Sequence, residues 1–267
     1  MSVRRLVRGT VPWADLEAVI EELAERYDEP EVHVRFLEAD NWLSTPCVVN
    51  DRWFVKVVSP QNALVHALFT GARNLGVFSS GTEGFFEPFD GPVEMAEHEL
   101  DATKRLREVG VNAPEPVESF EVDGYGVLVL EYLPDFTTLD ALSDEDVETL
   151  APELFEVLST MHDHDLAHGD LRGENVLVHQ NDLYFIDATN VSDEGVGGAR
   201  AYDLASALAE LEPRIGAQAA VAAAAEHYNP DAILDALDFL DFVNMRPDHD
   251  FDATGLKGEI EKLAARS

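Results

Sequence analysis

The alternation of apolar and polar residues predicts strands in the first half of the chain. Residues 32–36 alternate with a period of two, as in a strand with one buried face. Two further pairs of apolar runs flank short turn signals, Asn50-Asp51 and Asp123-Gly124. Because such dipeptides favour tight turns, each pair predicts a β-hairpin, at residues 47–58 and 117–132.

Apolar residues three or four positions apart predict helices at the start of the chain and through its second half. Ala201-Tyr202-Asp203-Leu204-Ala205 also opens a strongly apolar helix, in which Asp203 could cap the helix or brace a neighbouring loop. The sequence therefore predicts an α+β protein. The predicted helices are Pro12–Tyr27, Val93–Val109, Asp144–His164, Ile215–Tyr228, Asp231–Val243 and Ala253–Ala265.

Composition excludes several classes of protein. No apolar run approaches 18 residues, so we expect no membrane-spanning segment and no membrane partner. The basic N-terminus is followed by no apolar stretch, so we expect no secretory signal. The single cysteine, Cys47, excludes an internal disulfide framework, and a cytoplasmic location is the default.

The chain is strongly acidic, with 53 acidic against 18 basic residues and a net charge of −35. At molar salt the Debye length shrinks to roughly 3 Å, which removes most of the resulting repulsion. Hydrophobic content of 46% and 23 aromatic residues (14 Phe, 3 Trp and 6 Tyr) argue against a disordered acidic chain. We therefore expect a protein from a salt-accumulating halophile, with no broad surface for nucleic acids.

The most informative stretch runs from His168-Gly169-Asp170 to Asn175 and is followed twelve residues later by Asp187. Residues 176–178 and 184–186 read as paired strands that bring Asp187 back beside Asp170 and Asn175. Three oxygen-bearing side chains would then converge. The alternative is a capping Asp, a turn Asn and an Asp at a strand end, all common in those places.

Lys56 lies among Val55, Val57 and Val58 in an apolar strand. Because an ammonium is costly to bury alone, Lys56 should either reach solvent or neutralise an anion.

The ordered set Lys56, Glu99, Glu131-Tyr132, Asp170, Asn175, Asp187 and Asp203 resembles the protein-kinase-like superfamily over about residues 30 to 245. His168-Gly169-Asp170 is similar to its atypical branch, and the RIO kinases are the closest resemblance. The resemblance implies a bilobal fold with an antiparallel-sheet N-lobe, a mainly helical C-lobe and an extra N-terminal helix. The implied divisions are a helical extension at 1–30, an N-lobe at 31–133 with an inserted segment at 59–92, and a C-lobe at 134–267.

The resemblance also implies the residue roles. Asp170 would orient and deprotonate the acceptor hydroxyl, and Asn175 with Asp187 would bind Mg²⁺ or Mn²⁺. Lys56 would contact the ATP phosphates while Glu99 on the predicted helix at 93–109 holds it, with Glu97 as the second choice. Backbone groups at Glu131–Leu133 would bind adenine. His168 and Asp203 would support the loop. Arg172 could steady the transferred phosphate or bind a neighbouring carboxylate.

Three features depart from ordinary protein kinases. No glycine-rich loop lies between Phe36 and Val48, so either the hydroxyls of Ser44 and Thr45 substitute at the phosphates or the nucleotide is bound weakly. Asp187-Ala188-Thr189 replaces the usual Asp-Phe-Gly. Fifteen residues separate Asp187 from Asp203, too few for a long activation segment, so we expect no activation-loop switch and no extended-peptide groove.

The leading hypothesis is a RIO-like serine/threonine kinase or ATPase that phosphorylates a protein hydroxyl, or itself, with a protein or ribonucleoprotein as partner. Ribosome maturation is one setting that the resemblance allows. The alternatives are a small-molecule phosphotransferase of the aminoglycoside-kinase type and a nucleotide-binding pseudokinase scaffold. The Gly/Ser/Thr-rich residues 79–86 predict a mobile loop, with a nucleotide flap or a self-phosphorylation site as the other hypothesis.

Overall fold

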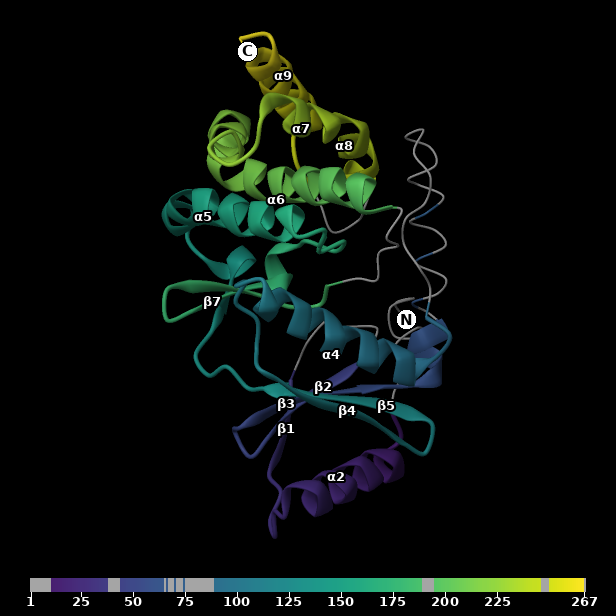
Figure 1. The fold of residues 1–267 in the computed structure, drawn as a ribbon. Coiled ribbons are helices and arrows are strands. Elements are labelled where there is room, and N and C mark those ends of the chain that lie inside the picture. The colour runs from purple at the N-terminus through teal and green to yellow at the C-terminus, as the bar shows by residue number, and fades with distance from the viewer. Residues whose placement is uncertain are drawn as a thin grey trace, which may run out of the picture. The chain divides into compact units, whose positions relative to one another are not determined.

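The computed structural model describes two compact units, drawn in Figure 1. The first comprises described residues of Met1–Gly71, Pro88–Arg105 and Pro114–Pro134, and the second comprises those of Ala72–Glu87, Leu106–Ala113 and Asp135–Ser267. The residues that the structure describes are 11–37, 44–64, 66, 70, 74, 89–188, 195–245 and 250–266.

The first unit is built on a five-stranded antiparallel sheet with the strand order β1-β2-β3-β5-β4. The two predicted hairpins are confirmed. Asn50 and Asp51 both have positive φ (53° and 50°), as do Asp123 and Gly124 (49° and 85°), which is the backbone that two-residue hairpin turns require. The strands are β1 (Val34–Phe36), β2 (Thr45–Val49), β3 (Trp53–Val58), β4 (Pro116–Val122) and β5 (Tyr125–Glu131).

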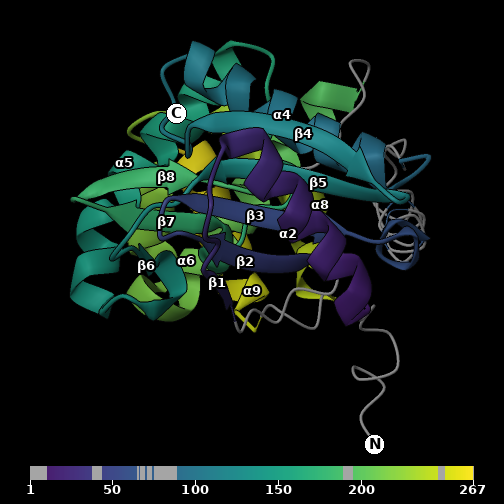
Figure 2. The ribbon, with the colours of Figure 1, turned by 90° about the horizontal axis from the view of Figure 1, so that it is seen from below.

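A helix covers each face of this sheet, α2 (Trp13–Tyr27) on one and α4 (Pro92–Glu108) on the other. The faces follow from the alternation of side chains along a strand. Val55 and Val57 of β3 pack in the same core cluster as α2, whereas Phe54 packs in the cluster that contains Leu100 of α4. Figure 2 shows α2 crossing the strands.

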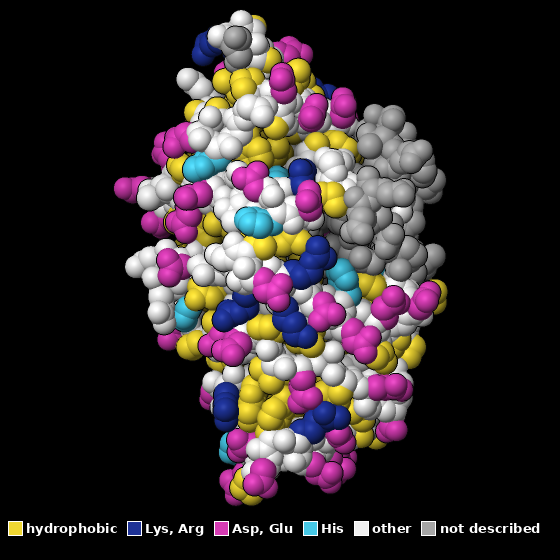
Figure 3. Space-filling model, viewed as in Figure 1, with side chains coloured by type: hydrophobic (Ala, Val, Ile, Leu, Met, Phe, Trp, Pro, Cys, Tyr) yellow, Lys and Arg dark blue, Asp and Glu magenta, His cyan; other side chains and the backbone are white. Residues whose placement is uncertain are grey.

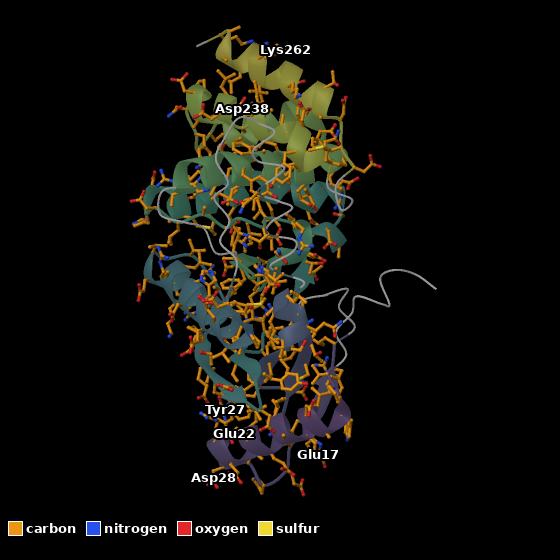
Figure 4. All side chains as sticks on the ribbon, turned by 90° about the vertical axis from the view of Figure 1, so that its right-hand side faces the viewer. Glu17, Glu22, Tyr27, Asp28, Asp238 and Lys262 are labelled. Atoms are coloured by element: carbon orange, nitrogen blue, oxygen red, sulfur yellow. The ribbon has the colours of Figure 1, made fainter. Side chains whose placement is uncertain are left out.

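Polar contacts at the end of α2 help hold that helix on the sheet. The ring of Tyr27 stacks on Trp53 with 4.4 Å between centroids, and its hydroxyl donates to Glu118 at 2.7 Å. Glu17, by contrast, is exposed on the outward side of α2, as Figure 4 shows. The predicted amphipathic helix at the start of the chain is therefore confirmed.

The second unit is mainly helical, with a small sheet of order β6-β7-β8. Its core cluster contains the buried faces of α5 and α6, including Phe155, Leu158, Tyr202 and Leu208. Together with the sheet of the first unit, this gives the predicted α+β class. The elements are β6 (Thr137–Thr138), α5 (Asp144–Asp163), β7 (Val176–His179), β8 (Asp182–Phe185), α6 (Val196–Ala224), α7 (Pro230–Asp235), α8 (Leu237–Asn244) and α9 (Ala253–Ala264), with 3₁₀ turns at Leu139–Ala141 and Gly173–Asn175.

Two helix predictions in this unit were wrong in their limits. The helix that carries Asp203 begins at Val196, not at Ala201, and α6 is interrupted at Gly216, whose backbone is not helical (φ 80°, ψ 155°). The part of α6 after Gly216 ends at Ala224 and corresponds to the predicted helix at 215–228. The predicted helix at 231–243 is two helices, α7 and α8, that join at Ala236. In both places the periodic pattern marked the buried face, which does not define where a helix starts or breaks.

The described helices include none that is both long and apolar enough to cross a membrane. Acidic side chains are scattered over the face of the protein shown in Figure 3. Cys47 is a buried residue of β2, and burial raises the pKa of its thiol to about 12, so it behaves as a small apolar side chain.

Candidate active site

In the first unit, Lys56 is paired with Glu99. The Lys56 side chain is 6% exposed, and its Nζ donates to Glu99 Oε1 at 2.6 Å. Lys56 pairs in register with Leu128 of β5, which places it on the sheet face that α4 covers. Glu97, the second choice, is exposed. The buried ammonium therefore has the anionic partner that its apolar surroundings demand.

Removing the charge of Glu99 should destabilise the first unit. We expect Glu99→Gln to lower the free energy of unfolding by about 2 kcal/mol, below the full cost of breaking a buried pair because Glu99 is partly exposed. The midpoint of urea unfolding measures this loss. Glu97→Gln, an exposed change two residues away, should stay within about 0.5 kcal/mol. Equal midpoints for the two variants would contradict the prediction.

Ser44 and Thr45 lie on opposite faces at the start of β2. Pro46 pairs with Lys56 across the sheet, so Pro46 faces α4, and Ser44, two residues earlier, continues along that face. Thr45 pairs with Val57 and belongs to the face that α2 covers. The Ser44 Oγ is buried and has no hydrogen-bond partner among the described residues. Of the two hydroxyls, Ser44 therefore shares a face with Lys56. The glycine-poor residues 38–43 lie outside the described residues.

The Glu131–Leu133 segment holds most of its backbone donors in the sheet. Glu131 N–H donates to the Glu115 carbonyl at 2.8 Å, and Tyr132 N–H donates to the Arg52 carbonyl at 2.9 Å. For Leu133 N–H, the described part of the chain offers no acceptor. Leu133 is thus the residue of the three whose N–H is available to a ligand.

In the second unit, Asp203 braces the loop that carries Asp170. Its carboxylate is fully buried and accepts the backbone N–H of His168 at 2.6 Å and that of Gly169 at 2.8 Å. Gly169 has φ of 74°, a backbone conformation that suits glycine. Because Asp203 lies inside α6 and not at its start, bracing is its role and capping is not.

His168 ties Asp170 to the strand end that carries Asp187. The backbone N–H of Asp170 donates to His168 Nδ1 at 3.3 Å, so the ring proton is on Nε2. That Nε2–H donates to the carbonyl of Ile186 at 2.9 Å, one residue before Asp187. The buried imidazole therefore fixes the spacing between the two backbone segments.

The side chain of Asn175 is oriented by the same loop. Its Nδ2 donates to the carbonyl of Asp170 at 2.8 Å, which leaves Oδ1 as the atom available to a cation. The backbone N–H of Ile186 donates to the Asn175 carbonyl at 3.1 Å, so Asn175 also lies beside the approach to Asp187. Asp187 has φ of 62°, in the left-handed region that aspartate tolerates better than most residues.

This pair of oxygen ligands fits a divalent cation that is completed by phosphate. Magnesium usually takes one or two protein oxygens and fills its octahedron with water and substrate phosphates. Among the described residues no group of three or more His, Cys, Asp or Glu side chains forms a metal site. Asn175 and Asp187 are the residues that could hold such an ion, with water and phosphate oxygens as its other ligands.

Arg172 contacts carboxylates in this structure. Its guanidinium donates to Asp170 Oδ2 at 3.1 Å and also pairs with Glu174. Partial burial raises the pKa of the Glu174 carboxyl above its ordinary value, while Arg172 opposes the rise. Of the two predicted roles of Arg172, carboxylate binding is the one that these contacts exhibit.

Sequence reasoning missed two residues behind the loop, His162 and Tyr228. His162 Nε2 lies 3.3 Å from Asp203 Oδ2, and the Tyr228 hydroxyl lies 2.8 Å from His162 Nδ1. Burial, helped by the charge of Asp203, raises the pKa of Tyr228, which keeps its hydroxyl a donor. The available signal was a histidine on the apolar stripe of the predicted helix at 144–164.

Two predicted features lie outside the described residues: the loop at 79–86 and Thr189 of Asp187-Ala188-Thr189.

Comparison with known proteins identifies the class. Residues 92–194 match the RIO domain. Among solved structures, the chain is similar to an aminoglycoside-3'-phosphotransferase of type VIII, with 18% identity, coverage of 87% of this chain and 100% of that one, and a TM-score of 0.52. The kinase domain of PknI from M. tuberculosis shows 15% identity, coverage of 89% and 96%, and a TM-score of 0.46. No curated protein matches the chain.

At such low identity the structural likeness establishes the fold, and the RIO-domain match concerns residues 92–194. The class as a whole uses ATP with a divalent metal. The chain therefore has a protein-kinase-like fold whose residues 92–194 are similar to the RIO domain, which supports an ATP-dependent phosphotransferase of RIO-like type.

Proposed function

We propose that the chain transfers the γ-phosphate of ATP to a serine or threonine hydroxyl of a protein, or to itself. The observation that carries the proposal is the set of hydrogen bonds that holds the loop of Asp170 and Asn175 in place. His168 and Asp203 hold the backbone of their loop, and His168 also binds the segment that ends in Asp187. This arrangement lies inside the region that matches the RIO domain, apart from Asp203.

In the proposed reaction, the acceptor oxygen forms a bond to the γ-phosphorus while the bond from that phosphorus to the β,γ-bridging oxygen of ATP breaks, and ADP leaves. Asp170 orients the hydroxyl and takes its proton, since its carboxylate is partly exposed and held in place by Arg172. A metal held by Asn175 Oδ1 and Asp187 would neutralise charge on the phosphates. Mg²⁺ is the proposed ion, with Mn²⁺ as its substitute.

The proposed nucleotide contacts come from the first unit. Lys56, held by Glu99, would neutralise phosphate oxygens. Ser44 has a buried hydroxyl on the same face, without a partner in the part of the chain that the structure describes, and would donate to a phosphate. Thr45 is less well placed for this role. Leu133 N–H and the backbone of Glu131 would bind adenine.

A second candidate is a small-molecule phosphotransferase. The likeness to the aminoglycoside-3'-phosphotransferase, which spans all of that chain, favours it. The protein acceptor is preferred because the matched domain is the RIO domain. A protein or ribonucleoprotein partner, with ribosome maturation as one setting, belongs to this same proposal.

The test is to incubate the purified chain and Mg-ATP carrying a labelled γ-phosphate with each acceptor class. The classes are the chain alone, a native extract, and a panel of small alcohols and amines. Label on seryl or threonyl residues of protein supports the proposal. ATP consumption that depends on a small alcohol or amine supports the second candidate. Nucleotide binding without transfer to any acceptor would establish a pseudokinase scaffold instead.

We also propose that the chain works in a salt-rich cytoplasm. With a net charge of −35, self-repulsion should destabilise it at low ionic strength and fade as salt is added. These assays therefore belong at molar as well as dilute KCl.

A further inference from the structure

Helix α4 rests directly on the backbone of β5 at Gly126. A Cβ added at Gly126 would lie 2.5 Å from the carbonyl carbon of Pro92 and 2.9 Å from the nitrogen of Val93, and closer still to the Pro92 oxygen. These are backbone atoms, which cannot rotate out of the way. Gly126 has no positive φ, so the contact, and not its backbone conformation, is what requires glycine.

The face of β5 that contains Gly126 packs against α4 as far as the position of Lys56. Gly126, Leu128 and Leu130 alternate along that face, and Leu128 and Leu130 pack with Ala96 and Leu100 of the helix. Figure 1 shows α4 lying across these strands. The distance of α4 from the sheet is therefore determined at its N-terminal end by the backbone contact between Pro92 and Gly126. Farther along the helix it is determined by side-chain packing.

Glu99 follows Pro92 by seven residues, about 10 Å along the helix axis. Lys56 stands opposite Leu128, two residues along β5 from Gly126, and its Nζ lies 2.6 Å from Glu99 Oε1. A hydrogen bond of this length is lost if the helix rises by about an ångström.

We propose that Gly126 is a positioning residue for phosphoryl transfer: the missing side chain seats α4 at the height that brings Glu99 into contact with Lys56. The proposal rests on the proposed function for its effect on catalysis. Its geometric part, the contact between Lys56 and Glu99, does not depend on that function and can be tested without measuring activity.

The direct measure of the pair is the rate at which an amine-acylating reagent modifies Lys56, followed by mass spectrometry. The chain has only three other lysines, and the exposed Lys104 is an internal reference. Gly126→Ala should raise the labelling of Lys56 several-fold relative to Lys104. It should also lower kcat/KM for ATP on the order of 100-fold, the effect that a shift of about 1 Å can have.

Two control variants separate this effect from general damage. Gly91→Ala makes the same substitution beside the start of α4, where an added Cβ meets no described residue within 4 Å, and should leave both readouts unchanged. Val127→Ala removes buried atoms from the next residue of β5, on the face that α2 covers. Val127→Ala should lower the free energy of unfolding. It should raise the labelling of Lys56 only as far as the larger unfolded fraction accounts for. Equal labelling in Val127→Ala and Gly126→Ala at matched stability would overturn the proposal.

A double-mutant cycle of Gly126→Ala and Glu99→Gln provides a second test of the proposal. In a Glu99→Gln background the pair is already broken, so Gly126→Ala should cause no further fall in kcat/KM. If the two substitutions instead lower kcat/KM by factors that multiply in the double variant, the proposal is overturned. If Gly126→Ala does not fold, Ala96→Val is the substitute, because its added methyl groups would push α4 away from Leu128 and Leu130, whose side chains can adjust. Unchanged Lys56 labelling in a folded Ala96→Val variant would also overturn the proposal. A wild-type chain without transfer activity would defeat the proposed function alone, because Lys56 labelling still tests the geometry.

Discussion

Asp170→Asn is expected to reduce phosphoryl transfer by about 10²- to 10⁴-fold, the usual contribution of a positioned general base. An asparagine keeps the size of the side chain but cannot take the proton of the acceptor hydroxyl. The folded state should change little, because the Asp170 carboxylate is partly exposed and its ion pair with Arg172 is not fully buried. Single-turnover transfer from labelled ATP measures the effect.

Nucleotide binding separates this result from general damage. Asp170 is not one of the proposed metal ligands, so the Kd for Mg-ATP should stay within about threefold, a change of less than 1 kcal/mol. Asp182→Asn is a matched control on the exposed end of the β7–β8 hairpin and should leave transfer intact. Transfer by Asp170→Asn at close to the wild-type rate would rule out Asp170 as the base.

Asp203→Ala is expected to have the largest effect on stability. Its carboxylate is completely buried and serves the N–H groups of His168 and Gly169 and the ring of His162. Removing it leaves buried donors without an acceptor, at about 1–3 kcal/mol for each. We expect a loss of about 3–5 kcal/mol in the free energy of unfolding, comparable to breaking a buried charge network.

Chemical unfolding measures the loss, and amide hydrogen exchange at His168 and Gly169 locates it. Asp203→Asn, which retains one oxygen acceptor, should fall between wild type and Asp203→Ala. The control is Asp238→Ala, an exposed aspartate on α8 that is labelled in Figure 4 and should change stability by about 0.5 kcal/mol or less. Wild-type protection of the two amides in Asp203→Ala would show that another group holds the loop.

Short-range signals in the sequence predicted much of this structure. Asn50-Asp51 and Asp123-Gly124 located both hairpins because only a few residue types adopt positive φ easily. The period of apolar residues located α2, α4 and α5 because each buries one stripe. The pairing of Lys56 with Glu99 was implied by the kinase resemblance, and the cost of burying an ammonium alone gives its physical reason.

The remainder depends on contacts that have no local signal. Gly197 and Gly198 are poor helix formers, yet α6 includes them because the helix packs on α5. The chain from Tyr228 through His162 to Asp203 joins residues up to 66 positions apart. The close approach of Pro92 to Gly126 is equally invisible in the sequence, since a glycine in a strand also marks a bulge or a weak position.

The order of strands in the first unit has a practical meaning for dissecting the gene. The RIO-domain match begins at residue 92, but β5 hydrogen-bonds with β3, which precedes that boundary. The match ends at residue 194, just before the helix whose aspartate accepts the amides of His168 and Gly169. An excised fragment 92–194 would thus have a severed sheet and an unsupported loop. Similarity alone is a poor guide to where this polypeptide tolerates being cut.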